Sequence, residues 1–196
     1  MCSSDLENPW NYVGDLFAHG IDGVALDEDV SCADLFKLDG KDVLLCISHR
    51  MGCRYYIGEW KNEQFYPESH AQMSWVDNTF FAPESLLDEK GRRIMWSWLL
   101  DFREFGVRLE QGWSGTMSLP RVLWLENGQM RLDVPEEIEL LRYRPEQLEN
   151  IEIQSESEII LETIRGNSIE IKLEFDGSSA AEYGIKVCCS PDGEIG

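Results

Sequence analysis

The chain of 196 residues carries 37 acidic and 17 basic side chains, which gives a formal net charge of −20 at pH 7. Such a charge repels phosphate backbones and anionic lipid headgroups, so we expect neither a nucleic-acid partner nor a membrane partner. No apolar run reaches the roughly 18 residues of a membrane-spanning helix, and the first residues lack the basic and apolar regions of a signal peptide. We therefore expect a cytoplasmic protein.

The six cysteines show no Cys-x-x-Cys pair and no histidine at the spacing of a zinc site. Cys46, for example, lies inside the apolar run 43–47. We interpret the cysteines mostly as reduced core residues, and we expect no metal site and no cofactor.

The first two thirds of the chain predict short strands separated by turns. The run 43–47 and the aromatic run 55–60 predict a hairpin, and further strands are expected at 93–99 and 122–125, the last followed by a turn at 126–128. Evenly spaced short strands with little helical periodicity indicate an all-β array, either a sandwich or the blades of a propeller.

The pattern changes near Pro135. Residues 136–142 predict a short helix or a last strand, and short apolar or alternating runs follow, which predict antiparallel strands with one wet face. These runs are 151–153, 158–162, 168–175 and 183–187. We therefore expect one domain at 1–141 and a second β domain at 142–196, which ends within a turn at 190–194.

Several motifs follow one another in the order and spacing of a known enzyme family. They are Ser-Asp-Leu-Glu-Asn-Pro-Trp within 4–14, Cys-Ala-Asp-Leu-Phe at 32–36, Phe-Phe-Ala-Pro-Glu at 80–84, Gly-Arg-Arg-Ile at 91–94, and Trp-Ser-Gly-Thr-Met-Ser-Leu-Pro-Arg at 113–121. Together they resemble glycoside hydrolase family 32, the β-fructosidases.

The resemblance implies a five-bladed β-propeller with a funnel-shaped active site on its axis, followed by a β-sandwich. This chain would supply about three blades, a partial propeller, and the start of the sandwich. A partial propeller leaves strand edges unpaired, so self-association through those edges is a further expectation.

The catalytic carboxyl groups of the family are missing from their usual motifs. A retaining glycosidase needs a nucleophile and a proton donor, two carboxyl groups roughly 5 to 5.5 Å apart. The resemblance places the nucleophile in Asn-Asp-Pro and a transition-state stabiliser in Arg-Asp-Pro, and neither motif occurs in this sequence. The proton donor would be a Glu directly before Cys32, where Ser31 stands. We therefore expect the isolated chain, interpreted as a fragment of the enzyme, to be inactive.

Two carboxyl groups are candidate substitutes for the missing proton donor. Asp29 lies two residues before Ser31 and so on the same face of a strand, while Glu84 stands where family members commonly have Gln. The competing interpretation of Asp29 is a solvated acidic loop at 27–29, and that of Glu84 is a residue without a site role.

The resemblance assigns further residues to the substrate: Ser31, Cys32, Asp34, Asp77 and Trp98. Asp34 would contact sugar hydroxyls or orient the acid, against the alternative of a turn-capping Asp. A tryptophan can stack on a fructose ring, although an aromatic residue in a strand more often belongs to the core. His49 is a candidate for the wall of the cleft or, alternatively, a hydrogen-bonded surface group.

Three hypotheses for function follow. The first is a β-fructosidase that acts on sucrose or short fructans, of which this chain is a part. The second is a non-catalytic carbohydrate-binding protein, which Ser31 would suit. The third is a sister glycosidase of family 43 or 68, which shares the propeller.

Overall fold

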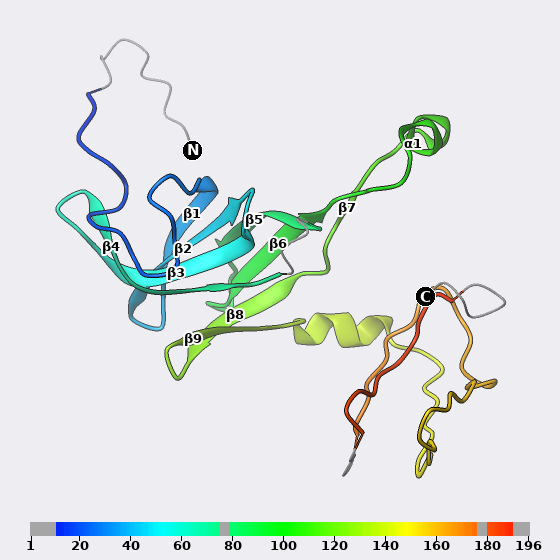
Figure 1. Cartoon of the computed structure of the whole chain (residues 1–196). Helices are drawn as coiled ribbons and strands as arrows, with labels where there is room; N and C mark the ends of the chain where they lie inside the picture. Colours follow the sequence, from blue (N-terminus) through cyan, green and yellow to red (C-terminus); the bar gives the residue numbers. More distant parts are fainter. Residues whose placement is uncertain (1–10, 75–78, 176–179, 190–196) are drawn as a thin grey trace. The chain divides into compact units, whose positions relative to one another are not determined.

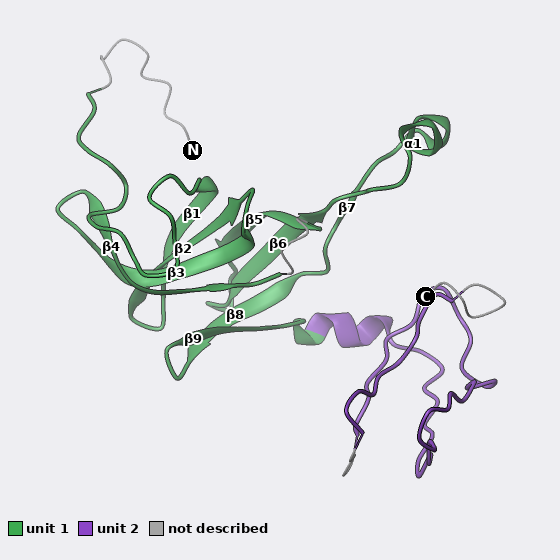
Figure 2. Cartoon of the chain, viewed as in Figure 1, with its two compact units in different colours: residues 1–136 green, residues 137–196 purple. Residues whose placement is uncertain are grey.

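The computed structural model describes residues 11–74, 79–175 and 180–189. The chain forms two compact units, Met1–Glu136 and Glu137–Gly196 (Figure 2). The expected domain boundary at 141/142 stays a prediction.

The first sheet of unit 1 is an antiparallel meander in the order β1-β2-β3-β4 (Figure 1). Its strands are β1 (Ser31–Leu38), β2 (Lys41–Ser48), β3 (Gly52–Lys61) and β4 (Gln64–Gln72). The register pairs Val43 with Ile57, which confirms the predicted hairpin. Asp39 and Gly40 both have positive φ, at 47° and 83°, and so make the tight turn between β1 and β2.

The second sheet has the order β5-β6-β8-β9, and a short fifth strand, β7, pairs with one end of β6. The strands are β5 (Phe80–Leu87), β6 (Arg93–Leu99), β7 (Thr116–Met117), β8 (Arg121–Glu126) and β9 (Gln129–Asp133). The two meanders pack on each other, which confirms the all-β class and agrees with two blades of a partial propeller. The strands of the described residues make two sheets, where about three blades were expected.

Strand β2 explains why unit 1 holds together. Val43 and Leu45 join residues of β6, β8 and β9 in one core cluster between the sheets, whereas Leu44 and Cys46 face a second cluster with Phe17. Because successive side chains of a strand point to opposite faces, a strand that is covered on both sides is apolar throughout. The continuous run 43–47 is therefore a strand between two layers.

Polar contacts also join the two sheets. The backbone N–H of Met130 donates to the hydroxyl oxygen of Tyr55 at 3.1 Å. The N–H of Leu125 donates to the carboxylate of Asp39 at 2.7 Å. One bond joins the β1–β2 turn to β8, and the other joins β3 to β9. Hydrogen bonds therefore hold the two sheets together in addition to apolar burial.

The cysteine expectation is correct for two of the five described cysteines, and Cys2 lies outside the described residues. Cys46 and Cys53 are buried, and burial raises the pKa of each thiol to about 12, so they are unreactive core residues. Cys32, Cys188 and Cys189 are exposed, which corrects the expectation for these three. Their apolar neighbours in the sequence do not form a closed layer around them.

The segment between β6 and β7, residues 100–115, forms an arm that extends from the second sheet, and helix α1 (Phe105–Gln111) lies at its tip (Figure 1). None of its residues is buried, and it ends at Gly112, whose φ of 73° gives the left-handed cap that glycine accepts without strain. The arm contributes no side chain to the core.

Unit 2 leaves the expected β-sandwich as a prediction, since its described residues form no strand. The 3₁₀ helix η1 (Glu136–Leu141) agrees with the expected short helix, but after it residues 142–175 and 180–189 contain no strand. Apolar residues such as Ile160 stay exposed. Alternation marks which side chains could share a face, but a strand also needs a neighbouring backbone to bond with. Across the described ranges, no helix is both long and apolar enough to cross a membrane.

Candidate functional site

The first strands of the two sheets, β1 and β5, share a local distortion, and the two sheets are called the first and second blade. In β1 and in β5 the register with the next strand shifts, and the residue in the shifted segment has positive φ: 49° at Cys32 and 48° at Ala82. Two residues later each strand carries a carboxyl group, Asp34 and Glu84. Bulges of this kind re-aim side chains, so the two blades present their acids in matching positions.

Asp34 connects the two blades. Its Oδ2 accepts hydrogen bonds from the backbone N–H of Ser85, at 2.9 Å, and from the Ser85 hydroxyl, at 2.5 Å. The carboxylate therefore holds β1 beside β5 and next to Glu84. The predicted contact of Asp34 with substrate stays a prediction.

Glu84 lies at a hollow of about 270 Å³ in the second blade. The other lining residues are Ala82, Trp96, Ser97, Trp98 and Met117. The Glu84 side chain is exposed, but the loss of water on its hollow side raises the pKa of its carboxyl above the ordinary value, and the negative charge of Asp34 raises it further. A carboxyl group that keeps its proton closer to neutral pH has the property that a general acid needs.

Ser97 forms part of the wall of the same hollow and is only 3% exposed. Its Oγ has no hydrogen-bond partner among the described residues. Because successive strand side chains point to opposite faces, the Ser97 hydroxyl shares the core face of Met95, and the rings of Trp96 and Trp98 lie on the other face.

Trp98 is 45% exposed and forms the aromatic wall of the hollow. Its ring meets Phe81 edge-on, with centroids 6.4 Å apart and planes at 89°. The arm covers its other edge: a Cβ on Gly115 would lie 1.9 Å from Trp98 Nε1, and Gly115 has a φ of 70°. Only glycine allows the backbone to approach the indole this closely.

Asp29 is surrounded by hydrogen-bond donors. Its carboxylate accepts bonds from Ser31 Oγ at 2.9 Å and from the backbone N–H of His49 at 3.0 Å, and His49 Nδ1 lies 2.7 Å away. Burial raises the pKa of Asp29, but the bonds from His49 and Ser31 together outweigh it, and the net pKa is lowered. A proton donor needs the opposite shift, so of the two candidate acids the geometry favours Glu84.

The remaining predicted residues fall in different places. The His49 ring packs against Phe81, with centroids 5.4 Å apart, and so lies where the two blades meet. Ser31 is bonded to Asp29, and Cys32 is exposed on its bulge. Asp77 lies outside the described residues. In the part of the chain that is described, no group of three or more His, Cys, Asp or Glu side chains is placed to hold a metal ion.

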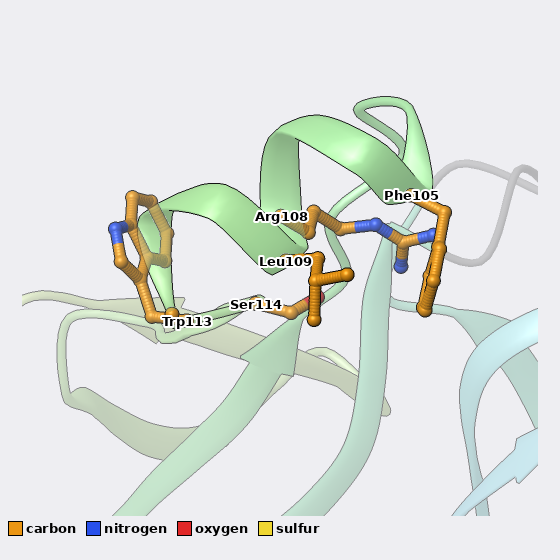
Figure 3. A pocket seen from close by; sticks show the side chains of 6 residues that line it. Phe105, Arg108, Leu109, Trp113 and Ser114 are labelled. Carbon is orange, nitrogen blue, oxygen red and sulfur yellow. The ribbon is translucent and has the colours of Figure 1, made fainter.

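A larger hollow, about 360 Å³, lies on the arm. Figure 3 shows Phe105 and Arg108 side by side at one end of it and Trp113 at the other. No carboxyl group lines it, and Arg103 beside it is committed to Asp101, at 2.6 Å, and to the Trp113 ring, at 4.1 Å. This hollow lacks the acid that bond cleavage needs, so we place the candidate site at Glu84.

Comparison with known proteins gives a family match. The model of the "Glycosyl hydrolases family 32 N-terminal domain" matches residues 2–134. A sucrose-6-phosphate hydrolase of Zymomonas mobilis is 28% identical over 176 residues, 83% of this chain and 34% of that protein. Fructan 1-exohydrolase w1 of Triticum aestivum is 33% identical over 152 residues, 72% of this chain and 24% of that protein.

The fold has counterparts among solved structures. Fructan 1-exohydrolase IIa from Cichorium intybus superposes with a TM-score of 0.50 at 26% identity, over 59% of this chain and 26% of that one. A structure of the same enzyme in complex with 1-kestose also has a TM-score of 0.50, at 27% identity. The chain thus spans about a third or less of the length of these relatives.

Proposed function

Because the chain belongs to glycoside hydrolase family 32, we propose that it supplies two neighbouring blades of the sugar-binding funnel of a β-fructosidase. The reaction is hydrolysis of terminal β-fructofuranosides such as sucrose and short fructans. The observation that carries the proposal is the hollow of β5 and β6, where the Glu84 carboxyl, whose pKa is raised, lies together with the half-exposed ring of Trp98.

Each group at the hollow has a role in this proposal. Glu84 donates the proton to the leaving oxygen as the glycosidic bond breaks, a role that its raised pKa suits. Trp98 offers a flat apolar face to the C–H groups of a sugar ring.

The 196-residue chain by itself is proposed to bind sugar without cleaving it. Retention requires a second carboxylate as nucleophile, roughly 5 to 5.5 Å from the first. Asp34 is bonded to Ser85 through Oδ2 and joins the blades, so it is ill suited to attack. The Asn-Asp-Pro motif that would carry the nucleophile does not occur in the sequence.

The test is a titration of the ¹⁵N-labelled chain with 1-kestose and with sucrose, followed through the indole N–H signals. The signal of Trp98 is identified by its loss in Trp98→Phe, and Trp124→Phe, also a partly exposed tryptophan of the second sheet, is the matched control. Saturable shifts of the Trp98 signal support the proposal. Shifts confined to other indoles, or none at millimolar sugar, would contradict it.

A non-catalytic carbohydrate-binding protein is the second candidate, favoured by Ser31 at the position of the family's proton donor. Fructose release separates the two in a protein that joins this chain to a segment with the Asn-Asp-Pro nucleophile. A β-fructosidase releases fructose there and loses the activity in Glu84→Gln, whereas a binding protein releases none. Glu89→Gln, at the turn after β5, is the control. The sister families 43 and 68 have no finding in their favour.

A further inference from the structure

We propose that His49, in the β2–β3 turn of the first blade, is a positioning residue for Trp98 and that Asp29 holds it in place. The rings of His49, Phe81 and Trp98 follow one another from the junction of the two blades to the hollow. This inference rests on the proposed function and deepens it, because Trp98 is the ring on which that function stacks the sugar. The first blade thus orients the sugar-binding ring of the second.

Asp29 fixes both the backbone and the ring of His49. Its carboxylate accepts the backbone N–H of His49 at 3.0 Å, and His49 Nδ1 lies 2.7 Å from Oδ2. Because a carboxylate oxygen only accepts hydrogen bonds, Nδ1 carries a proton and donates it. Ser31 Oγ donates to the same oxygen at 2.9 Å and so helps to hold the carboxylate. Although the His49 side chain is 63% exposed, these bonds restrict the rotation of its ring.

Phe81 depends on side-chain support because its strand is distorted beside it. The register of β5 with β6 shifts between Phe81 and Glu84, and Ala82 has a φ of 48°. A bulge interrupts the ladder of backbone hydrogen bonds and lets the strand bend, so the backbone alone does not fix the ring. The His49 ring meets the Phe81 ring with centroids 5.4 Å apart and planes at 70°, an edge-on arrangement that aromatic rings favour.

Phe81 in turn contacts Trp98, its partner across the two strands, with centroids 6.4 Å apart and planes at 89°. The Trp98 side chain is 45% exposed, so its orientation depends on a small number of neighbours. The backbone of Gly115 closely approaches one edge of the indole, and Phe81 meets the ring edge-on. Loss of the support for Phe81 therefore lets the indole turn, whereas stacking on a sugar requires one orientation.

The experiment separates the two features of His49. His49→Asn keeps a side-chain N–H for Asp29 but removes the ring, and it should shift the Trp98 indole signal of the ¹⁵N-labelled chain. We expect it to weaken 1-kestose binding about three- to tenfold. His49→Phe keeps a ring and should restore part of that affinity. The matched control is His19→Asn, because His19 also meets an aromatic ring, that of Tyr66 in β4, with centroids 6.0 Å apart.

Asp29→Ala tests whether Asp29 acts through His49. Alone it should shift the Trp98 signal, but in the His49→Asn background it should shift the signal no further, because the ring that it holds is absent. A merely structural role of Asp29 would give effects that add. The indole signal of Trp124, which should stay in place in every variant, reports that the second blade is folded.

The outcomes separate this inference from the proposed function. A Trp98 signal that does not move in His49→Asn refutes the inference, and so do additive effects of Asp29→Ala. If the signal moves but 1-kestose binds with unchanged affinity, His49 does not position the sugar-binding face and the inference is overturned. If the unaltered chain binds no 1-kestose, the proposed function fails, and the sugar-free spectra still decide whether His49 orients Trp98.

Discussion

Replacement of Gly115 by alanine tests the arrangement of the site most directly. The added Cβ would lie 1.9 Å from Trp98 Nε1, far inside van der Waals contact, and the backbone has a φ of +70°. Gly112 offers a matched control on the same arm, since its φ is +73° but a Cβ there meets nothing within 4 Å. The two substitutions therefore share the backbone strain and differ in the collision with Trp98.

The expected losses of unfolding free energy follow from the backbone strain and from the collision with Trp98. A left-handed backbone costs a residue with a Cβ about 1–2 kcal/mol, which is all that Gly112→Ala should lose. Overpacking against the indole adds about 1–3 kcal/mol, so Gly115→Ala should lower the free energy of unfolding by about 2–5 kcal/mol in total. If Trp98 instead rotates away, stability is partly kept but the sugar loses its stacking face.

Urea denaturation gives the free energies of unfolding, and the ¹⁵N spectrum gives the position of the Trp98 indole signal. Gly115→Ala should shift this signal and weaken 1-kestose binding, and Gly112→Ala should do neither. Equal losses of stability in the two variants, with the Trp98 signal unmoved in both, would refute the contact between Gly115 and Trp98.

Three further predictions concern the blades. Ser85→Ala removes one bond to the Asp34 carboxylate and should cost about 1–3 kcal/mol in urea denaturation; no loss would mean that the bond does not hold the blades together. Gly58→Ala places a Cβ 2.1 Å from a backbone oxygen of β4 and should cost about 3 kcal/mol or more, whereas Gly106→Ala, with open space, should be neutral or stabilising. Because Glu84 has a folded-state pKa above its ordinary 4.5, its contribution to stability is full below that pH and declines as the pH rises through the raised pKa. Glu84→Gln should therefore stabilise the chain at about pH 7 and be neutral at about pH 4; the reverse order would contradict the shift.

The strands of unit 1 could be predicted because their signals are local. Residues 93–99 are apolar and aromatic between two turn motifs, and the structure has β6 at Arg93–Leu99. The run 43–47 was recognisable because burial on both faces makes a strand apolar throughout. The runs at 151–153 and 168–175 have similar local signals, yet they form no strand, because pairing depends on a partner that the run itself does not encode.

The sequence by itself determined the family, the all-β class, the place of Glu84 in the motif 80–84 and the place of Trp98 after the motif 91–94. Only the tertiary structure decided what their neighbours do. It joins Asp34 to Ser85, 51 residues away, places Glu84 and Trp98 at one hollow, and holds Asp29 as a carboxylate beside His49. Such roles depend on hydrogen bonds and burial between distant segments, and these exist only after the two blades have packed together.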